Sequence, residues 1–125
     1  MQRHADHDTV VVGVDGSPEA AEALRYAAAA ARSRGLWLLV VHAYELPRHP
    51  GTMSTALVLA AAASAADRVA ADALSGVRIP AGVPVQTLVE RTAPVLMLRR
   101  LSERVALLVL GQHSADPSDP RSSGR

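Results

Sequence analysis

Four runs of apolar residues recur along this chain and alternate with segments of helical patterning. The runs are rich in valine and leucine and cover residues 9–15, 36–43, 83–90 and 105–111. The segments between them repeat apolar residues at helical spacing and cover residues 17–35, 52–74 and 92–105. Buried strands that alternate with helices are typical of a parallel sheet covered on both faces. We therefore predict an α/β fold.

The connections between these runs predict the order of the sheet. Crossovers between parallel strands are right-handed. If the second and third strands step outward one way and the fourth returns beside the first, the order is 3-2-1-4. The first two helices then lie on one face and the third on the other. Open sheets of this kind bind ligands where the strand order reverses, here between strands one and four. Asp15 ends the first run and Gly111 ends the fourth, so we expect both at one crevice.

Residues that favour helix ends define the predicted helices. Ser17 is expected to cap the helix over 17–35, with Pro18 at its first position and Gly35 at its end. Thr92 is the candidate cap of the helix over 92–105. Asp15, just before the first helix, suits two compatible roles: it can accept hydrogen bonds from amides of the turn, or position a nucleotide or metal.

Composition narrows the classes of function. A chain of 125 residues favours one domain, and the absence of cysteine excludes disulfides and thiolate metal sites. The net charge is +1, with basic residues spread along the chain, and the aromatic residues are only Tyr26, Trp37 and Tyr44. This pattern argues against a nucleic-acid partner.

The ends of the chain and its longest uncharged run bear on location and metal binding. The run over 50–66 is weak in hydropathy, and the polar start of the chain does not resemble a secretion signal. We therefore expect a cytoplasmic protein without a membrane partner. His4 and His7, with Asp6 or Asp8, could hold a metal, although a solvated terminus is the favoured interpretation.

Three segments carry a resemblance to a known family. They are VVVGVDGSPEA (10–20), LLVVHAYE (38–45) and VALLVLG (105–111), and together they resemble the universal stress protein family over residues 9–114. The resemblance implies a Rossmann-like or flavodoxin-like domain with a regulatory role in the stress response. Many members of the family bind ATP. It also implies that Asp15, Ala43 and Gly111 line the adenine and ribose.

The phosphate-binding loop of the family is only partly matched. In ATP-binding members the loop reads Gly, two residues, Gly, nine residues, Gly, then Ser or Thr. Here Gly111 takes the first position, Ser114 stands in place of the second glycine, Gly124 fits the third, and Arg125 follows it. A phosphate cradle needs several inward-pointing backbone N–H groups, often from glycines.

The residues inside this loop weaken it further. Pro117 and Pro120 each lack an N–H donor, and Asp116 and Asp119 would repel a triphosphate. We therefore expect ATP binding to be weak or lost. Weak binding here means a dissociation constant of about 1 mM, which corresponds to a binding free energy of about 4 kcal/mol. Ser114 and Gly124 remain candidate cofactor-binding residues together with Asp15, Ala43 and Gly111.

The family resemblance also implies that the fifth strand and the last helix are missing. Residues 1–8 and 115–125 are then expected to be disordered ends of a domain over 9–114. The fourth strand becomes an edge with unpaired backbone groups, which favours a homo-oligomer. Three explanations stay open: an altered copy of low stability, a shortened domain that self-associates, or a tail that covers the edge in a complex.

Three classes of function follow. The first is a regulatory, non-catalytic binding domain with a degenerate adenine-nucleotide site. The second is a non-nucleotide interaction module that self-associates through the edge of the fourth strand. The third, an enzyme such as a nucleotidyl transferase, is disfavoured because no group is placed for chemistry.

Overall fold

The structure is a computed structural model that describes residues 8–46, 54–103 and 105–111. Its elements follow the predicted alternation: β1 (Thr9–Gly13), α1 (Pro18–Arg34), β2 (Trp37–Tyr44), α2 (Thr55–Ser75), β3 (Val85–Arg91), α3 (Pro94–Ser102) and β4 (Leu107–Val109). The fourth strand is shorter than the predicted run over 105–111, because only Leu107–Val109 pair with β1. The alternation of strands and helices is confirmed.

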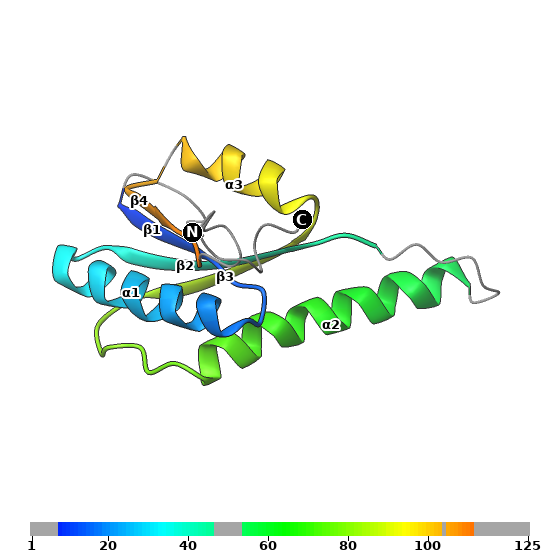
Figure 1. Ribbon diagram of the computed structural model, residues 1–125, viewed down its shortest axis with the longest axis horizontal. Coiled ribbons are helices and arrows are strands. Elements are labelled where there is room, and N and C mark those ends of the chain that lie inside the picture. The colour runs from blue at the N-terminus through cyan, green and yellow to red at the C-terminus, as the bar shows by residue number, and fades with distance from the viewer. Residues whose placement is uncertain (1–7, 47–53, 104, 112–125) are drawn as a thin grey trace, which may run out of the picture.

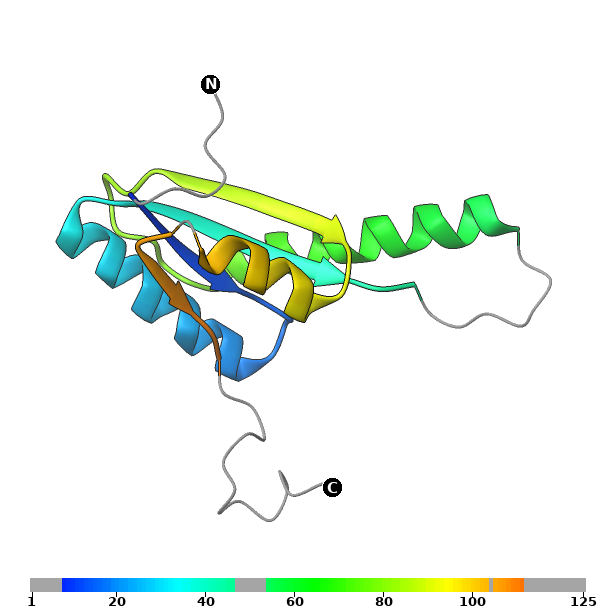
Figure 2. The same ribbon diagram turned by 90° about the horizontal axis from the view of Figure 1, so that it is seen from above.

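The strands of the described residues form one parallel sheet in the order β3-β2-β1-β4. This is the predicted order, and Figures 1 and 2 show β4 beside β1 at one edge and β3 at the other. The strand order reverses between β1 and β4. The carboxyl ends of these two strands therefore lie beside each other, as the sequence predicts.

Helices cover the two faces of the sheet unequally. α1 and α2 lie on one face and α3 on the other (Figures 1 and 2). The core under α1 includes Leu24, Ala27 and Ala31 against Val10 and Val12, and further side chains from β2 and α2 pack on it. The core under α3 is smaller, with buried Val11, Leu39, Val41, Met97 and Leu101. An ion pair between Arg100 and Glu90, at 2.6 Å, also joins α3 to β3.

The helix ends follow the predictions at α1 but not at α3. The Ser17 side chain accepts a hydrogen bond from the Ala20 amide, and Gly35 ends α1 in the left-handed conformation. The prediction that Thr92 caps the third helix is wrong. Ala93 is the capping residue and makes no side-chain hydrogen bond, because α3 begins at Pro94 and the residue before a proline prefers an extended backbone.

α2 is longer than the part of the sheet that it covers. Its first half reaches beyond the carboxyl end of β2 (Figures 1 and 2), and the buried residues of the helix are Ala66 and Ala70. Among the described residues, no helix combines the length and apolar character needed to cross a bilayer.

Candidate functional site

A crevice of about 290 Å³ opens at the carboxyl ends of β1, β2 and β4. Three of the sequence-predicted site residues line it: Asp15 after β1, Ala43 in β2 and Gly111 after β4. Ser114 and Gly124, the other two, lie outside the described residues. The crevice thus stands at the reversal of strand order, where ligands bind in sheets of this type.

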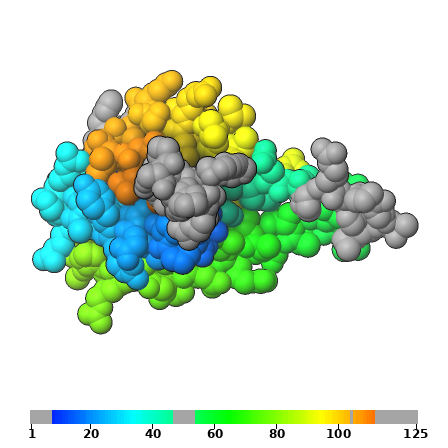
Figure 3. Space-filling view, viewed as in Figure 1, coloured from blue at the N-terminus to red at the C-terminus, as the bar shows by residue number. Residues whose placement is uncertain are grey.

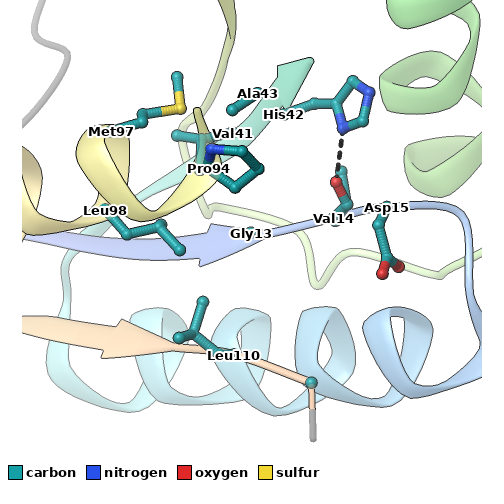
Figure 4. Close-up of a pocket in the computed structure, with 11 residues that line it drawn as sticks. Gly13, Val14, Asp15, Val41, His42, Ala43, Pro94, Met97, Leu98 and Leu110 are labelled. Carbon is teal, nitrogen blue, oxygen red and sulfur yellow. Dashed lines mark hydrogen bonds between the residues drawn. The ribbon is translucent and has the colours of Figure 1, made fainter. Parts of the chain in front are cut away.

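Two hydrogen bonds hold the end of β1 in place. The Val14 amide donates to the Val41 carbonyl at 2.9 Å, and the Val14 carbonyl lies 2.7 Å from Nδ1 of His42 (Figure 4). Because a carbonyl can only accept, Nδ1 carries the proton in this contact. His42 therefore acts as a structural hydrogen-bond partner, and it fixes the backbone that leads into Asp15.

The turn after β1 sets the position of Asp15. Its Oδ1 accepts a hydrogen bond from the Ser17 amide at 2.9 Å, and the Asp15 residue is exposed. Gly16, between them, has a φ of +86°, a backbone conformation that residues with a side chain rarely adopt. The Asp-Gly-Ser sequence thus folds as a turn in which the carboxylate binds a turn amide and also lines the crevice.

Gly111 makes a close backbone contact. A Cβ atom on this residue would lie 2.6 Å from the Glu19 carbonyl oxygen and 2.9 Å from the Ala20 amide nitrogen. Any side chain here would collide with the first turn of α1. The glycine is therefore required for packing, independently of any ligand.

Several residues of the crevice were not anticipated from the sequence. Pro94, Met97 and Leu98 reach it from α3, and Leu110 reaches it from the chain after β4. A Cβ atom on Gly13 would lie 3.3 Å from a methyl carbon of Leu110 and 3.8 Å from one of Leu98, so both side chains lie beside this glycine (Figure 4). The predicted topology placed the third helix on the sheet face opposite the first two helices. Helical spacing does not show how far along the sheet the helix lies, so its residues could not be assigned to the crevice.

Metal binding finds no support in the described part of the chain. There, no group of three or more His, Asp or Glu side chains could hold a metal ion. Of the candidate ligands near the start of the chain, for which a solvated terminus is the favoured interpretation, His4, Asp6 and His7 lie outside the described residues and Asp8 lies within them.

Comparison with known proteins decides the family. The family model of the Universal stress protein family matches residues 7–122, nearly the full chain. This chain belongs to the universal stress protein family. No curated protein matches it. The resemblance found in the sequence is therefore confirmed.

Solved universal stress proteins share the fold. A family protein from Burkholderia pseudomallei is 25% identical, with a TM-score of 0.60, and the match covers 86% of this chain and 83% of the other. Universal stress protein UspA from Lactobacillus plantarum is 19% identical, with a TM-score of 0.64 and coverages of 95% and 90%. A universal stress protein solved in complex with cAMP is 23% identical, with a TM-score of 0.54 and coverages of 97% and 87%.

Proposed function

We propose that this domain is a regulatory binding domain that holds the adenosine part of an adenine nucleotide weakly, without a catalytic step. The observation that carries the proposal is the meeting of Asp15, Ala43 and Gly111 at one crevice. The cAMP complex of a relative supports it, since there the same fold occurs with an adenine nucleotide. A role in the stress response follows from the family.

The shape and chemistry of the crevice agree with this ligand. Its volume of about 290 Å³ lies near the lower end of the range for small-molecule sites, roughly 300–1,000 Å³. Ala43, Pro94 and Leu98, which line the crevice and are not fully buried, supply apolar wall for a planar base. The Asp15 carboxylate accepts hydrogen bonds, as ribose hydroxyls require.

Calorimetric titration tests the proposal. Adenosine, AMP and ATP with Mg²⁺ are each titrated into the wild-type protein and into an Ala43→Phe variant, whose ring would fill the crevice. We expect at least one ligand to give a saturable heat of binding with the wild-type protein, with a dissociation constant of about 1 mM. The Ala43→Phe variant should give no such heat. The control is Ala71→Phe at an exposed position of α2. Absence of binding by all three ligands, or equal binding to Ala43→Phe, would refute the proposal.

The edge of the sheet supports a second candidate function, self-association through β4. Within the described residues no strand pairs with the outer side of β4, and Figure 3 shows this segment at the surface beside α1. Tyr26 is 63% exposed and lines grooves with Leu107 and Val109 between α1 and β4. An unpaired edge next to exposed apolar surface favours pairing with a second copy.

Sedimentation at increasing protein concentration tests this second candidate. We expect a dimer whose dissociation constant rises at least about tenfold in Tyr26→Glu, because the variant places a charge in the contact. Ala71→Glu adds the same charge on α2 and should leave the dimer unchanged. A monomer at all concentrations would exclude self-association.

A further inference from the structure

We propose that the crevice selects an uncharged nucleoside over its phosphorylated forms. This inference rests on the proposed function and adds the class of ligand. Three features of the described residues support it: the hydrogen bonds already made at the start of α1, the position of Gly111, and the charge of the crevice wall.

The start of α1 has few amides to offer a phosphate. A helix N-terminus next to a strand end is the usual phosphate site in sheets of this type. Here the Ser17 amide donates to Asp15 at 2.9 Å, and the Ala20 amide donates to the Ser17 hydroxyl at 3.1 Å. Pro18 has no N–H, and Glu19 places an acidic residue in the first turn. A phosphate would have to displace the cap and approach two carboxylates.

The chain after β4 occupies the space beside this turn. The backbone of Gly111 lines the crevice and lies so close to Glu19 and Ala20 that a Cβ could not be added. A phosphate group that entered from the crevice would need this same space. Reaching the amides of α1 would therefore require β4 to move away from α1.

The wall of the crevice carries the wrong charge for a polyphosphate. Among the described residues, the 11 that line it include no arginine or lysine, and Asp15 is the carboxylate among them. The contact of His42 with the Val14 carbonyl engages one of its ring nitrogens. The remaining side chains are apolar, including Leu98 and Leu110 beside Gly13 (Figure 4). Ribose hydroxyls can donate to Asp15, whereas phosphate oxygens would be repelled by it.

Calorimetry with adenosine, AMP and ATP, with and without Mg²⁺, ranks the ligands at about 10 mM salt, where charge repulsion is weakly screened. We expect adenosine to bind at least about tenfold more tightly than ATP, with AMP between them. Asp15→Asn keeps an acceptor for the Ser17 amide but removes the charge, so the adenosine-to-ATP ratio should fall to within about threefold. Asp72→Asn, at an exposed position near the end of α2, should keep the wild-type ratio.

The outcomes separate this inference from the proposed function. ATP binding as tight as adenosine, or tighter, would overturn the nucleoside preference and leave adenine binding intact. An unchanged ratio in Asp15→Asn would overturn the electrostatic origin given to it. At about 300 mM salt the wild-type ratio should fall, because screening weakens repulsion, and a ratio independent of salt would contradict the inference in the same way. The proposed function itself would be refuted by the absence of all binding, or by equal binding to wild type and Ala43→Phe.

Discussion

At the scale of single residues, Gly111 shows how one sequence signal can serve two needs. A glycine after a buried strand suits a phosphate loop, and the family resemblance placed it beside the ribose. The structure adds a reason that does not involve a ligand, since a Cβ here would lie 2.6 Å from the Glu19 carbonyl oxygen. The sequence could not reveal this contact, because Gly111 and Glu19 come together only when β4 pairs with β1.

The Gly111→Ala variant tests the packing role of this residue. We expect it to lower the free energy of unfolding by about 1–3 kcal/mol without any ligand, since the methyl group forces β4 away from α1. Urea denaturation followed by circular dichroism measures the change. Gly76→Ala is the matched control, because Gly76 has a φ of −85° and the added Cβ would lie 3.3 Å from its nearest neighbour, the Asp72 carbonyl oxygen. Equal stability of Gly111→Ala and wild type would show that the chain tolerates a side chain here.

At the scale of elements, proline explains why one predicted cap was right and the other wrong. Ser17 and Thr92 are both hydroxyl residues near a predicted helix start, but they stand at different distances from the following proline. Pro18 directly follows Ser17, so the serine becomes the capping residue. Pro94 follows Ala93, so α3 starts one position too late for Thr92 to cap it. The prolines therefore locate the helix starts better than the hydroxyl residues do.

Paired alanine variants test this assignment of the caps. Ser17→Ala should lower the free energy of unfolding by about 1 kcal/mol, because the Ala20 amide loses its acceptor. Thr92→Ala should change stability by less than about 0.5 kcal/mol, since α3 has no side-chain cap bond. Thermal unfolding by calorimetry compares the two. A larger loss in Thr92→Ala than in Ser17→Ala would reverse the assignment.

At the scale of the whole molecule, the sequence predicted the fold better than it predicted the site. Alternating strand and helix patterns, together with right-handed crossovers, were sufficient for the order β3-β2-β1-β4. Asp15 and Gly111 could be placed at the crevice because each follows a strand, and Ala43 because of the family resemblance. Met97 and Leu98 could not, because the contacts of a helix depend on where it lies along the sheet.

The unequal coverage of the two faces predicts how the molecule opens. Under α1 and α2, Leu24 and Val10 belong to an extended core, whereas the core under α3 centres on Met97 and Leu101. α3 has nine residues, and β4 pairs through only three. Local stability follows buried apolar contact. We therefore expect α3 and β4 to open together, at a lower free energy than β1, β2 and α1.

Native-state hydrogen exchange at low denaturant concentrations measures this difference directly. Amides of α3 and β4 should exchange through a local opening, and those of β1 and β2 only through global unfolding. Met97→Ala should then lower protection most in α3 and β4, because the variant removes the centre of the smaller core and destabilises its region by about 2–5 kcal/mol. Leu24→Ala, an equally buried position in the larger core, should lower protection in every element. If α3 instead exchanged at the same free energy as β1, the two faces would unfold as one unit, and the smaller core would have to be as stable as the larger one.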